Sequence, residues 1–326
     1  MRTTAAVALI AKLAFAQSGS LEVLNHGRPM VDAHNCYPYE GRWRDRIDRA
    51  LSAGFPVSIE QDIASYRGRV VVSHTTKTTG VEPLLRDYFF ERVRPIIEKA
   101  LAEGDRSHWP LITLHFDFKS NDPPLLRAVW NLLGEYEGWI TTARKTADPR
   151  QLAPFDPKPL LVITEDPDIQ EQAFFTDVPV GGKLRLFGSA RRHEIEGKTR
   201  EEREHLLATL TPSELLSEPP TNYRRWWNNS WHAVEEGGQT KAHEWTPAAE
   251  QRLRALVDYA HHQGYWIRFY TLDGFGEPDN RGWDANYNFG SRDAVIVRWR
   301  AAIRAGVDFI ATDQYEDLAA FMKQVN

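Results

Sequence analysis

The sequence has very little cysteine, since Cys36 is the only one among its 326 residues. One cysteine excludes an internal disulfide and any metal site built from several thiolates, and it leaves the redox compartment undecided. The chain also lacks a basic stripe, because its lysines and arginines are spread along its length and its formal net charge is -5. A nucleic acid is therefore not an expected partner. Beyond the first residues, no uninterrupted apolar run is long enough to cross a bilayer.

The first residues, MRTTAAVALIAKLAFAQS, have the order of a secretory signal peptide. A basic start is followed by an apolar stretch and by Ala-Phe-Ala at positions 14–16, which fits an A-x-A cleavage site. Lys12 interrupts the apolar stretch, so an ordinary N-terminal helix is the alternative. We expect residues 1–16 to be a signal peptide and the protein to be secreted or periplasmic. Without cleavage, we expect a cytoplasmic protein.

Short apolar segments alternate with helix-like segments through most of the chain, which predicts a parallel sheet covered by helices. Gly54, Gly104, Gly264 and Gly306 each end a helical segment just before a new strand, as expected of helix C-caps. About eight strand–helix pairs without a linker predict an α/β fold, a single (β/α)8 TIM barrel over residues 28–326. The expected strands include MVDAHN, VSIEQDI, GRVVVSHT, LITLHFDFK, PLLVITED, KLRLFGSA, WIRFYTLDG and DFIATDQ.

The stretch from 191 to 245 breaks this alternation. It contains a charged helical segment, two consecutive prolines and the aromatic segment NYRRWWNNSWH. We expect an irregular insert here, in which the aromatic segment can contain another barrel strand. The tryptophans Trp226, Trp227, Trp231 and Trp245 either pack this stretch or form a rim that contacts lipid. The second alternative would give the protein peripheral contact with a membrane.

Two of the predicted strands carry acidic side chains on one face. Successive side chains of a strand point to opposite faces, so Glu60 and Asp62 share a face of VSIEQDI, as Asp117 and Lys119 do in LITLHFDFK. In a barrel the apolar faces pack against helices, so these polar faces point inward. Three carboxylates at neighbouring strand ends would repel one another unless a cation lay between them. Oxygen ligands favour one divalent ion, Ca²⁺ or Mg²⁺, with Asn35 as a candidate fourth ligand.

Two histidines end predicted strands at the same rim of the barrel. His34 follows the first strand and His74 ends VVVSHT, and barrel active sites lie at the carboxyl ends of the strands. Two imidazoles beside a metal ion can act as acid and base in displacement at phosphorus, and Lys119 can neutralise charge on the phosphate. We therefore expect a phosphodiesterase. Arg268 and Tyr270 share a face of the seventh strand, where the arginine either binds substrate phosphate or forms an internal salt bridge.

The segments AHN, IEQD, VVSHT and FDFK, in this order, resemble the superfamily of phosphatidylinositol-specific phospholipase C and glycerophosphodiester phosphodiesterases. The resemblance implies the same barrel, the same metal and histidine positions, and a small-molecule or lipid phosphodiester as substrate. The asparagine after His34 resembles the calcium-dependent phospholipase C branch, because glycerophosphodiester phosphodiesterases usually have Arg-Gly there. The closest resemblance is to the altered-inheritance-of-mitochondria branch, although Cys36 stands where that branch has aspartate. The later segments IRFYTLDG and AGVDFIATDQYEDL resemble the superfamily's last two strands.

Other interpretations stay open. His34 alone is typical of a turn, Lys119 can form a purely structural ion pair, and His115 is expected to be a core histidine. A catalytically silent barrel that binds phospho-headgroups or glycans would keep the same carboxylates. A metal-dependent amidohydrolase also begins with DAH, but it needs a second histidine where Cys36 stands. The sequence does not identify the substrate headgroup or the oligomeric state. It also does not distinguish hydrolysis from formation of a cyclic phosphate.

Overall fold

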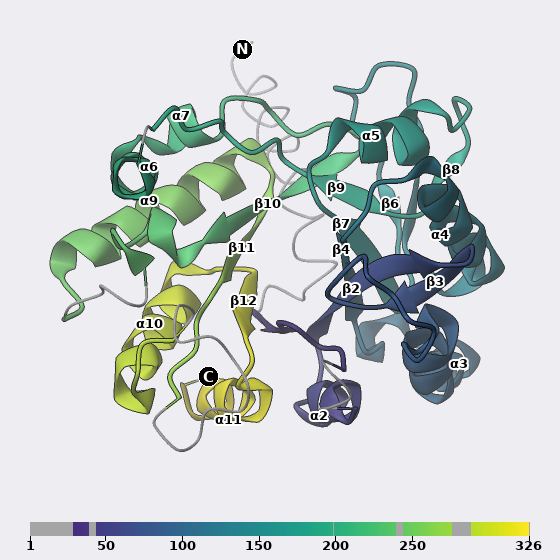
Figure 1. Ribbon diagram of the computed structural model, residues 1–326, viewed down its shortest axis with the longest axis horizontal. Coiled ribbons are helices and arrows are strands. Elements are labelled where there is room, and N and C mark those ends of the chain that lie inside the picture. Colours follow the sequence, from purple (N-terminus) through teal and green to yellow (C-terminus); the bar gives the residue numbers. More distant parts are fainter. Residues whose placement is uncertain (1–28, 39–43, 198, 239–243, 276–287, 326) are drawn as a thin grey trace, which may run out of the picture.

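A computed structural model describes the protein, and Figure 1 shows its ribbon. The described residues are 29–38, 44–197, 199–238, 244–275 and 288–325. The predicted signal peptide lies outside this part of the chain. The described residues form a single domain in which helices surround a closed parallel sheet, so the predicted TIM barrel is confirmed.

Eight parallel strands form the barrel. In spatial order they are β1 (Met30–Ala33), β12 (Phe309–Thr312), β11 (Trp266–Tyr270), β10 (Arg224–Ser230), β9 (Phe187–Ser189), β7 (Leu160–Thr164), β4 (Ile112–Phe118) and β2 (Val57–Tyr66). The sheet closes because β2 pairs again with β1, Val31 opposite Val57. All carboxyl ends of the strands therefore meet at one rim, which is where side chains from distant segments can form a site.

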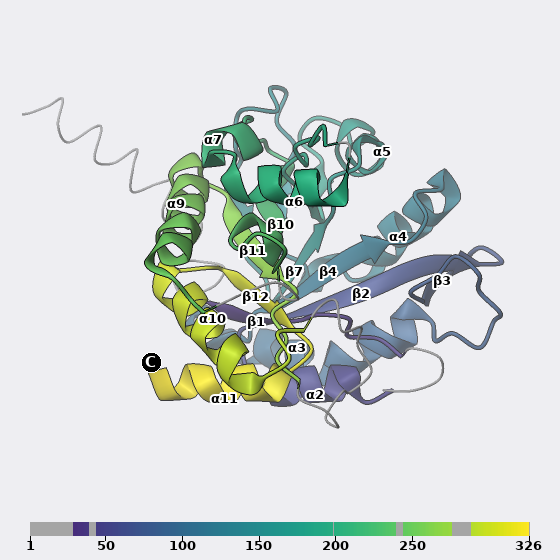
Figure 2. The same cartoon turned by 60° about the vertical axis from the view of Figure 1, so that its left-hand side comes forward.

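Two of the expected strands differ from barrel strands. The segment GRVVVSHT forms β3 (Arg69–Val72), which pairs antiparallel with the outer end of β2. Arg67 and Gly68 both have positive φ, which suits the tight turn of a hairpin, and Figure 2 shows the hairpin extending away from the barrel. The sixth barrel strand is instead β10, inside the aromatic segment of the predicted insert. The segment KLRLFGSA divides into barrel strand β9 and β8 (Lys183–Leu184).

The helices surround the barrel in space (Figures 1 and 2). Along the chain they connect its strands. Six of them are α2 (Arg46–Ser52), α3 (Glu91–Glu103), α4 (Pro123–Glu135), α9 (Pro247–Gln263), α10 (Arg292–Ala305) and α11 (Tyr315–Val325). Between β7 and β10 the chain forms α5 (Asp168–Glu171), η4 (Gln172–Thr176), α6 (Arg200–Thr209) and α7 (Pro212–Leu215). Outside the barrel, β8 joins β5 (Thr142–Arg144) and β6 (Phe155–Asp156) in a small sheet. No helix among the described residues has the length and apolar content needed to cross a membrane.

Alternation along the barrel strands separates the hydrophobic core from a polar interior. On β4, Ile112, Leu114 and Phe116 are fully buried in the main hydrophobic cluster. The intervening His115 lies within 3.6 Å of Glu60 on β2, inside the barrel. This arrangement confirms that the polar faces of the two strands point inward.

The tryptophans of the aromatic segment belong to the core. Trp226 and Trp231 are fully buried, and Trp227 is nearly so. Trp245 packs against the same cluster, with its ring centroid 6.0 Å from that of Trp231. The packing interpretation is therefore confirmed for these four side chains, and they do not form an exposed rim.

A partly buried histidine on α9 pairs with an aspartate just before β12. His261 Nε2 lies 2.8 Å from Asp308 Oδ2, which also accepts a hydrogen bond from the backbone of Ile267. Burial lowers the pKa of His261, but the hydrogen bond and charge of Asp308 outweigh burial, so the pKa is raised above its usual value. A raised pKa in the folded state means that this pair stabilises the protein below the unfolded pKa of about 6.5 and loses its effect as pH rises.

We predict that His261→Gln lowers the free energy of unfolding by about 1 kcal/mol at pH 5.5 and by clearly less at pH 9. Urea denaturation at the two pH values would measure this difference. His262→Gln is the matched control, because His262 is the exposed neighbour on the same helix and should change neither value. An equal loss at both pH values would show that the ion pair does not contribute.

Candidate active site

A cleft of about 670 Å³ opens at the carboxyl ends of the barrel strands. Eight of the nine site residues expected from the sequence line it, and the ninth, Asp62, lies buried behind them. The eight lining residues are His34, Asn35, Glu60, His74, Asp117, Lys119, Arg268 and Tyr270. Residues separated by more than two hundred positions therefore meet at one rim, because the parallel sheet closes.

The three predicted metal ligands come together on neighbouring strands. Asp62 on β2 stands directly opposite Asp117 on β4 in the sheet register. Carboxylate oxygens of Glu60, Asp62 and Asp117 lie within 4.8 Å of one another. Asp62 Oδ1 is buried and has no hydrogen-bond partner among the described residues, which is costly unless a ligand completes it. These carboxylates therefore fit a hard metal ion, which would bind through their oxygens.

Lys119 contacts two members of this carboxylate cluster. Its Nζ lies 2.8 Å from Asp62 Oδ2 and 2.8 Å from Asp117 Oδ2. Burial lowers the pKa of the ammonium, but the charges of the two carboxylates outweigh it and raise the pKa above its ordinary value. Lys119 is thus a fixed positive charge at the wall of the cleft. Lys119 therefore forms the ion pairs of a structural role. It also lines the cleft, as a residue that neutralises charge on a substrate phosphate would.

Each of the two predicted catalytic histidines is oriented by a carboxylate. His34 Nδ1 lies 2.9 Å from Asp313 Oδ1, and His74 Nδ1 lies 2.6 Å from Asp62 Oδ2. Burial alone lowers the pKa of His34, but the charge of Glu60 and the hydrogen bond to Asp313 raise it to about 9. The pairing fixes the ring orientation of both histidines at the rim of the cleft.

Asn35, the predicted fourth metal ligand, makes two hydrogen bonds within the site. Its Oδ1 accepts a hydrogen bond of 2.7 Å from Tyr37 Oη, and its Nδ2 donates to Asp313 Oδ1 over 3.1 Å. The carbonyl oxygen keeps a second lone pair, so the role of Asn35 as a metal ligand stays a prediction. Its backbone has a positive φ of 53°, a conformation that asparagine tolerates and that often marks a functional site. Asn35 positions the pair of His34 and Asp313.

Arg268 forms the internal salt bridges that were the alternative to phosphate binding. Its guanidinium donates to Asp32 and Glu60, and also to Asn228 Oδ1 at 3.1 Å. The side chain is only 3% exposed, so its positive charge is paired with these buried carboxylates inside the barrel. Tyr270 lies beside it, 5.4 Å from the guanidinium carbon, and stacks on His34 at 6.2 Å between ring centroids.

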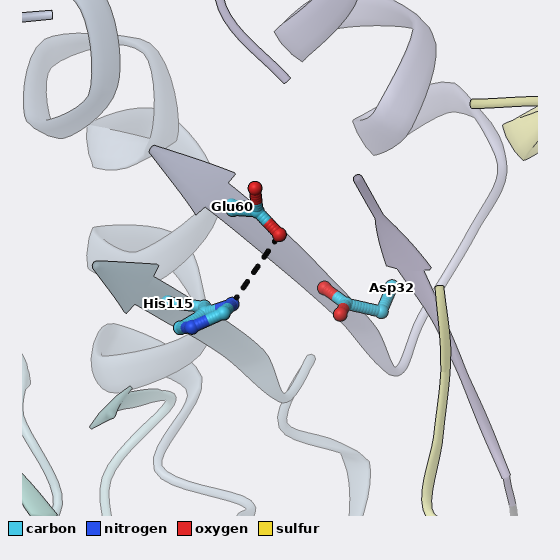
Figure 3. Close-up of side chains that lie close together, drawn as sticks. All are labelled: Asp32, Glu60 and His115. Carbon is cyan, nitrogen blue, oxygen red and sulfur yellow. Dashed lines mark ion pairs between the residues drawn. The ribbon is translucent and has the colours of Figure 1, made fainter. Parts of the chain in front are cut away.

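A second cluster of metal-ligating groups lies deeper in the barrel. Figure 3 shows Asp32, Glu60 and His115 pointing toward one another from β1, β2 and β4. Arg268 donates to both carboxylates of this group, so a guanidinium already supplies the positive charge there. Lys119 likewise supplies a positive charge to the cluster of Glu60, Asp62 and Asp117, and Asp32 Oδ1 also has no hydrogen-bond partner among the described residues. The two clusters differ in position, because Asp117 lines the cleft whereas Asp32 is fully buried below it.

Several residues of the site were not expected from the sequence. His115 is buried as predicted, but its Nε2 also lies 2.8 Å from Glu165, which lines the cleft. Glu165 lies near the end of the predicted strand PLLVITED, just as Asp117 lies near the end of LITLHFDFK, so strand position was an available signal. Asp313 belongs to the Thr-Asp pair after the last strand. Nothing in the local sequence linked it to His34, 279 positions away.

Comparisons with known proteins leave the family of this chain undecided. No family model and no curated protein matches it. A glycerophosphoryl diester phosphodiesterase from Parabacteroides distasonis is similar, with 13% identity, 95% of this chain and 92% of that chain covered, and a TM-score of 0.44. Wild-type HPPK-DHPS from Plasmodium falciparum gives 9% identity, 91% and 46% coverage, and a TM-score of 0.43. Likenesses this weak distinguish neither family nor activity.

The carboxylate cluster predicts a measurable metal effect. We expect millimolar Ca²⁺ or Mg²⁺ to raise the Tm of the wild-type protein, because a ligand at 100 times its Kd adds about 2.7 kcal/mol to the folded state. Asp62→Asn should lose most of this increase, since it removes charge at the centre of the cluster. Thermal denaturation with and without each ion tests this. Asp87→Asn, an exposed carboxylate elsewhere, is the control, and an equal shift in wild type and Asp62→Asn would contradict the assignment.

Proposed function

We propose that this protein is a phosphodiesterase that uses one divalent cation, Ca²⁺ or Mg²⁺, and two histidines as acid and base. One observation carries the proposal. His34 and His74, each held by a carboxylate, line the same cleft as the carboxylate cluster and Lys119. General acid, general base, a metal site and a fixed cation are the groups that displacement at a phosphodiester requires.

The carboxylates Glu60, Asp62 and Asp117 would hold the ion, and a bound Ca²⁺ or Mg²⁺ would supply charge neutralisation at the phosphate. Lys119 adds a second positive charge at the same wall, held in place by Asp62 and Asp117. Asp62 links the two halves of the site, because it contacts both Lys119 and His74. A cation and an imidazole are thereby positioned by one buried carboxylate.

The two histidines divide the proton transfers between them. One takes a proton from the attacking hydroxyl, and the other gives a proton to the leaving oxygen. Asp313 holds the ring of His34. Tyr37 Oη lies 2.9 Å from His74 Nδ1, and the rings of Tyr37 and His74 stack on each other. The attacking hydroxyl belongs to water in a hydrolysis, or to the substrate itself when a cyclic phosphate forms.

Phospholipids or their deacylated headgroups are the proposed substrates. The ordered motifs of the phospholipase C and glycerophosphodiester phosphodiesterase superfamily, including the likeness to its altered-inheritance-of-mitochondria branch, support this choice. A signal peptide at residues 1–16 would bring the enzyme outside the cytoplasm, where peripheral contact with a lipid surface would supply substrate. The amidohydrolase alternative is disfavoured, because Cys36 is fully buried and burial raises the pKa of its thiol.

The histidines provide the direct test. We predict that His34→Ala and His74→Ala each lower kcat/KM for bis(p-nitrophenyl) phosphate by about 100-fold or more, because each removes a proton-transfer group. A chelator should abolish the wild-type activity. His108→Ala is the control and should keep full activity, because His108 is exposed and does not line the cleft. Absence of turnover on this diester and on phosphatidylinositol, with headgroup binding intact, would favour the silent barrel. Phosphorus NMR would separate hydrolysis from cyclic-phosphate formation.

Asp313 is proposed as the positioning residue for His34. We predict that Asp313→Asn lowers kcat by at least about 10-fold with little change in KM, because the imidazole loses its orienting carboxylate while the cleft keeps its shape. Steady-state kinetics well below the melting temperature measures both constants. Asp308→Asn is the matched control, since it weakens the His261–Asp308 pair, which lies outside the cleft, and should reduce stability without reducing kcat. A change confined to KM would contradict the positioning role.

A further inference from the structure

A second cavity adjoins the cleft, and we call it the annex. It has a volume of about 990 Å³ and shares Asp166, Arg192, Asn228 and Tyr270 with the cleft. The ends of β10 and β11 form one side of the annex, and residues from 192–195 and 200–207 form the other. The active cleft therefore continues into a space large enough for a complete small-molecule substituent.

We propose that the annex binds one alcohol portion of the substrate and that this portion carries a second anionic group, a carboxylate or a phosphate monoester. Arg192 and Arg203 would receive that group. The inference rests on the proposed phosphodiesterase function, and it adds a substrate class to it. A phosphodiester has two substituents on phosphorus, and the annex offers a place for one of them next to the reacting atoms.

The arginines of the segment beside the annex differ in their partners. Arg191, which does not line the annex, pairs with Asp168, Glu171 and Glu218. Arg200 lines the annex and pairs with Glu204 at 2.6 Å.

Two further arginines line the annex without an acidic partner. Arg192 and Arg203 form no ion pair with any carboxylate among the residues that the structure describes, and Arg203 donates only to the carbonyl of Gly197, at 3.0 Å. Most donors of these two guanidinium groups are therefore available to a ligand. Paired donors in a fixed plane match a carboxylate or phosphate.

Three carboxylates also line the annex, namely Asp166, Glu194 and Glu204, so their formal charge cancels that of its three arginines. Glu204 is engaged by Arg200, and Asp166 accepts a hydrogen bond from the backbone of Arg192. The available guanidinium donors of Arg192 and Arg203, and not a net positive charge, therefore favour an anion.

The other walls suit the carbon skeleton of such a substituent. Trp227 and Leu215 are almost fully buried and line the annex together with Leu207. Thr271, at the end of β11, has a φ of 72°, which is an unusual conformation for a β-branched residue. Backbone strain of this kind persists at binding sites where the surrounding structure enforces it. The annex thus combines apolar walls with the guanidinium groups of Arg192 and Arg203.

A matched pair of substrates tests the proposal. Glycerophosphoserine and glycerophosphoethanolamine differ only by one carboxylate, so the ratio of their kcat/KM values isolates recognition of the second anion. We expect wild type to prefer glycerophosphoserine by about 10-fold at low ionic strength and Arg203→Gln to reduce this preference to about 2-fold or less. The preference of wild type should also fall as salt is raised, because the contact is partly exposed.

Arg127→Gln is the control variant. Arg127 is exposed on α4 and has no ion pair among the described residues. Figure 1 shows α4 on the opposite side of the barrel from α6, whose residues line the annex. Its substitution removes one positive charge and should leave the ratio and the activity at wild-type values. Equal kcat/KM values for the two substrates in wild type, or an unchanged ratio in Arg203→Gln, would overturn the proposal while leaving the phosphodiesterase function in place.

Binding measurements separate the two hypotheses. If wild type turns over neither substrate, the proposed function fails, and isothermal titration of both compounds then tests the annex alone. Tighter binding of glycerophosphoserine to wild type than to Arg203→Gln would support the annex without catalysis. Equal affinities of wild type and Arg203→Gln for glycerophosphoserine would overturn it.

Discussion

The interior of this barrel depends on the balance of buried charge. Asp32 and Glu60 are both almost completely buried, and either carboxylate alone would be strongly destabilised by the loss of water. Arg268 donates to both, so one guanidinium from β11 compensates carboxylates of β1 and β2. Removing one partner of such a buried group costs several kcal/mol, about 3–5, because a charge remains unpaired. The positions of Glu60 and its neighbours at the rim follow from this pairing.

Compensation of buried charge also positions the side chains of the cleft. Lys119 compensates Asp62 and Asp117, and Asp62 in turn orients His74. Asp313, which follows β12, orients His34 at the end of the neighbouring strand β1. Hydrogen bonds through Tyr37 and Asn35 connect the proposed acid and base, because Tyr37 contacts His74 and Asn35, and Asn35 donates to Asp313. A substitution in this network is expected to affect both catalysis and the local fold, which is why isosteric changes are informative.

The loops at the rim decide what the cleft can accept. The hairpin of β2 and β3 places His74 beside the cleft, because β3 runs back along β2 from Tyr66 and the backbone N–H of Ser73 donates to the carbonyl of Asp62. The segment after β9 continues the cleft into the annex. In barrels of this kind the strands supply the reacting groups, and the segments that follow them supply substrate selectivity.

The sequence by itself determined the barrel, its inward polar faces and the meeting of Glu60, Asp62 and Asp117, because strand alternation and parallel closure depend on local patterns. It also placed His34 and His74 at the same rim. Only the tertiary structure decided which partner each group takes: Asn35 joins Asp313 and Tyr37, Arg268 turns inward, and Glu165 pairs with His115. These choices depend on distances between residues that are far apart in the chain. Local periodicity carries no information about such distances, and burial of charge selects the partner.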